Sequence, residues 1–203
     1  MKKIRATRRV LDRLLDRRNE HPEQLPQIDA RIREVFEQEK TVLVLDMCGF
    51  SRLTIKHGVI HYLSMIRRMQ CVVAPLVLAG SGRIVKSDAD NVVGVFAAVP
   101  AAIRAACVIH ESLARANAFL PEDWDIHVGI GIGHGPLLVI GDHDVFGSEM
   151  NLASKLGEDV AKAGQVLLTE EAFARAGRYR SGYRKRATRL GKLALTYYES
   201  KKG

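Results

Sequence analysis

The order of apolar segments between Thr41 and Tyr198 limits the fold of this chain more than any other feature. Strand-like and helix-like patterns follow one another as strand, helix, strand, strand, helix, strand, and a short helix and two closing strands come after them. Residues 83–96 are predicted to be one hairpin and residues 125–142 a second hairpin. This order is typical of ferredoxin-like α+β folds. The sequence therefore predicts a βαββαβ core in which helices cover one face of an antiparallel sheet, and solvent, a ligand or a partner meets the other face.

Two amphipathic helices are predicted before this core. Apolar residues recur at helical spacing on both sides of the break HPEQLP, residues 21–26. We therefore expect a basic helical segment over residues 1–40 and one folded domain over residues 41–203. Each helix has to bury its apolar stripe on the domain or on a second copy of the chain. Such a segment is expected to regulate the domain or to support dimerisation.

Composition argues against several classes of protein. No uncharged apolar run approaches the roughly 18 residues of a membrane span, and no signal peptide is recognisable, so we expect a cytoplasmic protein without a membrane partner. The net charge is +8, with Lys and Arg gathered at the two ends, but no aromatic residues alternate with the basic ones of the N-terminal end. Nucleic acid is therefore not the expected partner.

Most local motifs point to structure rather than chemistry. The three cysteines form no CxxC pair, and His57 and His61 have HxxxH spacing without a third ligand nearby. No GxxxxGK[ST] loop is present, which excludes a P-loop nucleotide site. Glycines at every second position from Gly129 to Gly135 place a smooth face on one strand, where another backbone or a ligand can approach closely.

Two aspartates far apart in the sequence carry the strongest chemical signal. Asp46 ends the first strand, and Asp90 lies at the tip of the hairpin expected to pair beside it. Two carboxylates at one sheet edge repel each other unless a cation lies between them, and Mg²⁺ takes such ligands together with substrate phosphates. Cys48 and Gly49 follow Asp46 at a predicted helix start, where free backbone N–H groups attract anions. The combination predicts chemistry on a nucleoside triphosphate.

The chain from Thr41 to Tyr198 resembles the catalytic domain of class III nucleotidyl cyclases, the adenylate and guanylate cyclases. The resemblance lies in VLVLDMCGFSRL, GRIVKSDADNVVGVF, HVGIGIGHGPLLVIGDHDVFGSEMNLASKL and AKAGQVLLTEEAF, in this order. It implies the ferredoxin-like fold, two Mg²⁺ ions per site with Mn²⁺ as a substitute, and sites shared between two subunits arranged head to tail. One chain with both halves of the site implies a homodimer.

The resemblance also assigns roles to residues. The metal set is Asp46, the adjoining Met47, and Asp90. The turn that holds the phosphates comprises Cys48, Gly49, Phe50 and Ser51. The base is read by Lys86 and Asp144, Asn151 orients the ribose, and Lys155 and Arg186 contact phosphate. The family usually has Arg at the position of Lys155, and lysine lacks the planar fork of arginine. Asp88, between Lys86 and Asp90, also departs from the family, where an apolar residue is common.

The resemblance favours conversion of ATP to 3′,5′-cyclic AMP and pyrophosphate, because Lys86 can donate to a ring nitrogen while Asp144 accepts from the adenine amine. Cytosine presents the same acceptor beside an amine, so a cyclase acting on CTP, or on GTP or UTP, is the alternative. A catalytically silent nucleotide-binding regulatory module is a further alternative, chiefly because of Lys155.

Overall fold

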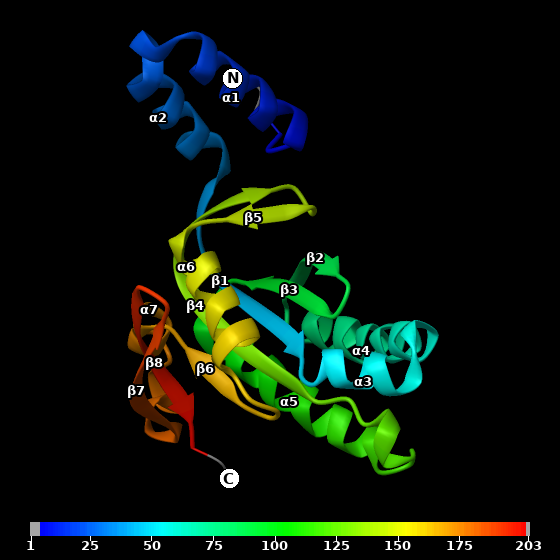
Figure 1. Ribbon diagram of the computed structural model, residues 1–203. Helices are drawn as coiled ribbons and strands as arrows, with labels where there is room; N and C mark the ends of the chain where they lie inside the picture. Colours follow the sequence, from blue (N-terminus) through cyan, green and yellow to red (C-terminus); the bar gives the residue numbers. More distant parts are fainter. Residues whose placement is uncertain (1–4, 202–203) are drawn as a thin grey trace.

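A computed structural model describes residues 5–201 of the protein, without the side chains of residues 50–53 (Figure 1). The main helices are α1 (Arg8–Glu20), α2 (Leu25–Phe36), α3 (Phe50–His57), α4 (Val59–Ala79), α5 (Val99–Asn117), α6 (Ser148–Ser154) and α7 (Glu170–Ala174). The strands are β1 (Glu37–Met47), β2 (Arg83–Asp88), β3 (Asn91–Phe96), β4 (Val128–Ile140), β5 (Asp144–Phe146), β6 (Val166–Leu168), β7 (Tyr183–Leu190) and β8 (Leu193–Ser200). A π-helix, η3 (Lys155–Val160), continues α6.

The strands form a single sheet in the order β2-β3-β1-β4-β6-β8-β7, and β5 pairs with the far end of β4. All pairs are antiparallel except β4–β6. The predicted ferredoxin-like α+β fold is confirmed. The second predicted hairpin is wrong in detail, because residues 128–140 form one long strand and its hairpin partner is β5. None of the glycines within β4 has the positive φ that would mark a turn, so the backbone continues in the extended conformation through all of them.

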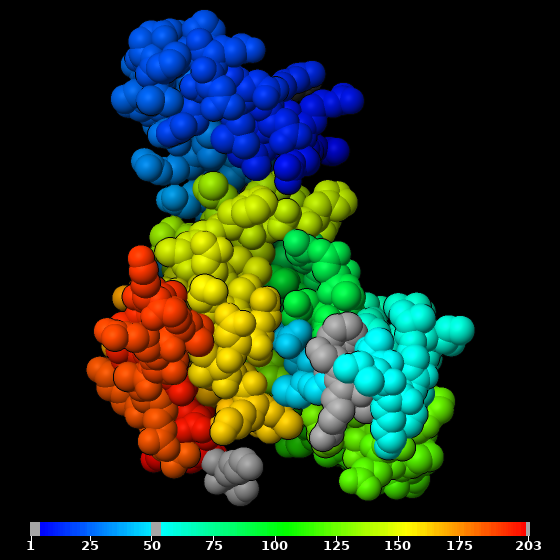
Figure 2. Space-filling model, viewed as in Figure 1, coloured from blue at the N-terminus to red at the C-terminus, as the bar shows by residue number. Residues whose placement is uncertain are grey.

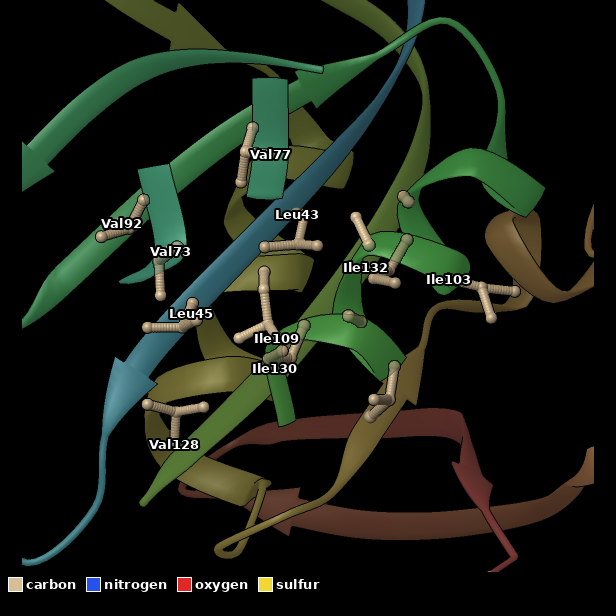
Figure 3. Packing of buried hydrophobic residues seen from close by; sticks show 14 of the residues in the cluster. Leu43, Leu45, Val73, Val77, Val92, Ile103, Ile109, Val128, Ile130 and Ile132 are labelled. Carbon is tan, nitrogen blue, oxygen red and sulfur yellow. The ribbon is translucent and has the colours of Figure 1, made fainter. Parts of the chain in front are cut away.

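Alternate residues of β1 belong to two different cores. Leu43 and Leu45 pack with α4 and α5 on one face of the sheet, as Figure 3 shows for their contacts with Val73, Val77 and Ile109. Val42 and Val44 face the other side and join a second buried cluster that includes Ala153 of α6. The period of two in a strand produces this division. Helices thus lie on both faces, and not on one face as predicted.

The glycines of β4 let α6 and η3 lie directly on the sheet. A Cβ on Gly131 would collide with the carbonyl oxygen of Ala153, and one on Gly133 would meet the backbone of Glu149. The predicted close approach at this strand face is therefore confirmed, and the approaching group is the backbone of α6. This contact fixes where α6 presents its side chains.

The N-terminal helices stand at one end of the molecule, above the β5 hairpin (Figures 1 and 2). Their apolar stripes bury Leu11, Ile28, Ile32 and Phe36 against one another and against Ile140 of β4. The apolar stripes of α1 and α2 are therefore buried on the domain of the same chain, which is one of the two expected places. Strand β1 begins at Glu37, so helix α2 leads into the sheet with no residue between them.

By length and composition alone, helix α4 could cross a membrane, whereas the sequence analysis predicted no segment that could do so. Its buried face, including Tyr62, Met65, Met69 and Val73, packs in the core of the domain. His57 and His61 behave as packing groups: their rings lie 4.7 Å apart, and His61 meets Trp124 edge-on at 4.7 Å.

Candidate active site

Sheet register brings the two predicted metal aspartates together. Asp46 lies opposite Asn91 in the β1–β3 pairing, and Asn91 directly follows Asp90. With its amide nitrogen turned toward Asp46, Asn91 donates to the Asp46 Oδ1 atom at 2.9 Å and to the Leu45 carbonyl at 3.1 Å. The turn before Asn91 contains Ala89 in a left-handed conformation, with φ of 47°. Both carboxylates therefore lie at one edge of the sheet, as the sequence predicted.

The charge around Asp46 is unbalanced. Burial, followed by the negative charges of Asp90, Glu158 and Asp159, raises the pKa of Asp46 to about 7. The buried Tyr62 faces the same site: burial, a hydrogen bond to Asp90 and the charges of Asp90 and Asp46 raise the pKa of its phenol. Crowded, partly desolvated carboxylates of this kind are stabilised by a cation.

Asp46 and Asp90 fit a hard divalent ion. Both offer carboxylate oxygens, the ligands that Mg²⁺ prefers, and Mg²⁺ commonly uses one or two carboxylates with substrate phosphates and water. Within residues 5–201 no group of three or more His, Cys, Asp and Glu side chains is arranged around one point. The pair offers an ion two carboxylates, and the remaining ligands would come from substrate phosphates and water.

Sequence reasoning missed Glu158 and Asp159. The π-helix η3 carries them to the end of β1, since a Cβ on Gly157 would lie 2.7 Å from the carbonyl oxygen of Val44. Burial raises the pKa of Glu158 in turn. A single π-turn inside a helix often marks a functional site. The adjacent acidic residues after NLASKLG were a visible signal, but no spacing rule connects them to Asp46.

A turn and a helix start are present at the position predicted to hold phosphates, with one difference from the prediction. The backbone N–H of Cys48 was predicted to be free to bind an anion. It instead donates to the His127 carbonyl at 2.8 Å. Gly49, with φ of 86°, leads into α3, whose first N–H groups follow. A cavity of about 490 Å³ beside this turn is lined in part by Cys48, Gly49 and Lys56. The Phe50 and Ser51 side chains lie outside the described residues.

The two predicted base-reading residues occupy neighbouring hairpins. The Lys86 Nζ atom lies 3.3 Å from the Asp88 carboxylate, so the unexpected Asp88 is an ion-pair partner of Lys86. Asp144 begins β5. Val85 and Val145, adjacent to these two residues, share one buried cluster. Arg83 also ties β2 to the β4–β5 turn, because its guanidinium donates to the Gly141 carbonyl at 2.6 Å.

Asp46 and Asp144 lie level with opposite ends of β4. Asp46 is level with Gly129 near the start of this strand, and Asp144 is level with Ile140 at its end. The contour between these positions is roughly 35 Å at about 3.3 Å per residue.

The three remaining predicted residues differ in their surroundings. Asn151 is exposed on α6, and Lys155 begins η3 with its Nζ atom 3.4 Å from Asp159. Arg186 lies on β7 and donates to Glu199 at 2.9 Å. Strands β4, β6 and β8 separate β7 from β1. The structure therefore brings Lys155, but not Arg186, toward the carboxylates around Asp46.

No protein-family model matches the sequence. The chain is 31% identical over 129 residues to "Putative adenylate cyclase 3" of Rhizobium meliloti (strain 1021), a match that covers 64% of this chain and 22% of that relative. The chain thus spans about a fifth of the length of this relative.

Solved cyclase structures share the fold. The guanylyl cyclase Cya2 superposes with a TM-score of 0.68 at 17% identity, covering 81% of this chain and 92% of that one. The adenylyl cyclase CyaB from P. aeruginosa gives a TM-score of 0.66 at 20% identity, covering 82% and 96%. The chain therefore shares the fold of class III adenylyl and guanylyl cyclase domains and is similar in sequence to a putative adenylate cyclase.

Proposed function

We propose that this nucleotidyl cyclase domain converts ATP to 3′,5′-cyclic AMP and pyrophosphate at sites shared by two copies of the chain. In this reaction the ribose 3′ oxygen bonds to the α-phosphorus, the bond from that phosphorus to the pyrophosphate oxygen breaks, and the hydroxyl proton passes to solvent. The observation that carries the proposal is the paired placement of Asp46 and Asp90 beside a glycine-capped turn.

Asp46 and Asp90 would hold two Mg²⁺ ions, which activate the attacking hydroxyl and neutralise the charge of the leaving group when bound. The raised pKa of Asp46 supports this role, because a cation replaces the repulsion among the carboxylates with attraction. Backbone N–H groups at the start of α3 would hold phosphate oxygens, where the helix dipole favours negative charge.

The placement of Asp144 favours a site made by two chains. A nucleoside triphosphate is much shorter than the length of β4 that separates Gly129, opposite Asp46, from Ile140, opposite Asp144. A head-to-tail homodimer would set the base-reading end of one chain against the metal end of its partner, and its symmetry would create two equivalent sites. In each site Asn151 would orient the ribose, and Lys155 would contact phosphate.

The preference for ATP rests on Lys86 and Asp144. Lys86 would donate to the ring nitrogen of adenine, and Asp144 would accept from its exocyclic amine. A cytosine base offers the same two groups, so CTP is the second candidate substrate. The free cysteines Cys48, Cys71 and Cys107 are compatible with a reducing, cytoplasmic location, which we also propose.

The test is turnover of ATP, GTP, CTP and UTP, each with Mg²⁺ and with Mn²⁺, with cyclic products identified by mass spectrometry. We expect cyclic AMP from the wild-type protein and none from Asp46→Asn. A different cyclic nucleotide would retain the mechanism and overturn the base assignment. Binding of triphosphates without turnover under either metal would indicate a silent nucleotide-binding module.

A further inference from the structure

The first N-terminal helix reaches the predicted base-reading aspartate. The Arg8 Nη1 atom of α1 lies 3.8 Å from the Oδ2 atom of Asp144 on β5. These residues are 136 positions apart in the sequence (144 − 8), and no motif connects them. The contact exists because α1 and α2 pack on the end of β4, where Ile140 joins their apolar cluster.

The two oxygens of Asp144 have different surroundings. Oδ1 accepts a hydrogen bond from the Val145 backbone N–H at 3.0 Å, which fixes the carboxylate plane. Oδ2 faces Arg8 at a distance too long for a hydrogen bond, so its lone pairs are still available to a ligand. Asp144 is thus a half-buried acceptor, with one oxygen held and the other beside a positive charge.

Arg8 is itself held in place. Its Nε atom donates to the Asp12 carboxylate at 2.9 Å, one helical turn further along α1. This bond uses one side of the guanidinium and leaves Nη1 directed toward β5. The positive charge therefore lies beside Asp144 without occupying the acceptor.

We propose that Arg8 is a positioning residue of the base-reading site, keeping Asp144 as an oriented acceptor for an exocyclic amine of the substrate base. This inference rests on the proposed role of Asp144 in nucleotide binding. It makes α1 part of the specificity machinery, so release of the N-terminal helices from β5 would weaken discrimination between bases. By linkage, a bound amine-bearing base would favour the docked helices.

The experiment measures binding rather than turnover. Dissociation constants are determined with Mg²⁺ for 3′-deoxy-ATP and for the same triphosphate without the 6-amino group, neither of which can cyclise. The ratio of the two constants reports recognition of the amine. The variants are Arg8→Ala, Arg8→Lys, Asp12→Asn and Asp144→Ala, and the matched control is Arg13→Ala, because Arg13 is exposed on α1 and forms no ion pair within the described part of the chain.

We expect Arg8→Ala to reduce the preference for the amine about two- to fivefold, the scale of an exposed ion pair, and Asp144→Ala to abolish it. Asp12→Asn should have a smaller effect, Arg8→Lys should restore most of the preference, and Arg13→Ala should leave it unchanged. High salt should reduce the difference between wild type and Arg8→Ala in their preference for the amine, because salt screens the charge of Arg8. If Arg8 had a purely structural role, salt would not change this difference.

An unchanged ratio in Arg8→Ala, or no preference for the amine in the wild-type protein, would overturn the inference. Circular dichroism of each variant verifies that the overall helix content is unchanged. If the wild-type protein turns over no triphosphate, the cyclase proposal fails, whereas the binding ratios still decide the role of Arg8.

Discussion

Asp46 lies directly opposite Asn91 in the β1–β3 register, which sets its carboxylate beside the turn that carries Asp90. Two residues separated by 44 positions (90 − 46) become neighbours because β1 and β3 are adjacent antiparallel strands. Glu158 and Asp159 of η3 add further negative charge around Asp46. This end of the sheet concentrates carboxylates whose repulsion a bound cation would relieve.

Removing the Asp46 charge should abolish turnover. Asp46→Asn keeps the shape of the side chain but removes a metal ligand, and loss of several kcal/mol of charge stabilisation corresponds to about a 10³-fold fall in kcat. The measurement is the initial rate of cyclic nucleotide formation at saturating Mg²⁺. Asp16→Asn, at an exposed aspartate of α1, is the control. Substantial activity in Asp46→Asn would contradict the metal assignment.

The same substitution should stabilise the metal-free protein at alkaline pH. The folded-state pKa of Asp46 is raised from its ordinary 3.8 to about 7, so the native protein binds this proton more tightly than the unfolded chain does. Its contribution to stability is present below pH 4 and is lost as the pH rises through about 7. With a chelator, Asp46→Asn should therefore melt at a higher temperature than wild type at pH 8 but not at pH 4.

Added Mg²⁺ should reduce the difference in melting temperature between wild type and Asp46→Asn at pH 8. Binding to the native state stabilises it, so Mg²⁺ should raise the melting temperature of wild type more than that of Asp46→Asn. An equal response of both proteins would argue against a metal at Asp46.

Two inactive variants should complement each other if the sites are shared. Asp46→Asn damages the metal end and Asn151→Ala damages the ribose end. In an equal mixture with random exchange, half of the dimers are mixed and each has one intact site, so about one quarter of wild-type activity should return. Activity is assayed after co-refolding. No recovery, with exchange verified by mass, would show that each site uses one chain.

Lys155 should act on the transition state rather than on substrate binding. Lys155→Ala should lower kcat about 10²-fold with little change in KM, the scale of removing one preorganised donor. Lys155→Arg should retain activity, and Lys162→Ala should match wild type. A change confined to KM would assign Lys155 to ground-state binding.

Gly131 should be intolerant of a side chain. Its added Cβ would collide with the Ala153 carbonyl oxygen, and an atom that overpacks a core typically costs about 1–3 kcal/mol in the free energy of unfolding. Gly182→Ala is the matched control, since a Cβ there meets nothing within 4 Å. The measurement is urea denaturation of both variants. Equal stability of the two would contradict the close packing of α6 on β4.

Sequence by itself determined much of the domain. The continuous apolar run in TVLVLDM predicted a buried strand, and the glycines of GIGIGHG predicted a close approach of another backbone or a ligand. Asp46 and Asp90 were expected at one edge of the sheet. These features are local, because the spacing of apolar residues along a strand indicates which faces are buried, and a glycine indicates where another group approaches the backbone closely. The same patterns could not separate one long strand from a hairpin at residues 125–142, because alternating glycines are compatible with both.

Tertiary structure alone decided the charges around these residues. Glu158 and Asp159 approach Asp46 through a π-turn, Arg8 approaches Asp144 through the packing of α1 on β4, and Arg186 is held by Glu199 away from β1. Electrostatic interaction depends on distance in space and on burial, and neither can be read from spacing along the chain. Sheet register and helix docking set those distances, so the strands and glycines were predictable while the partners of the site residues were not.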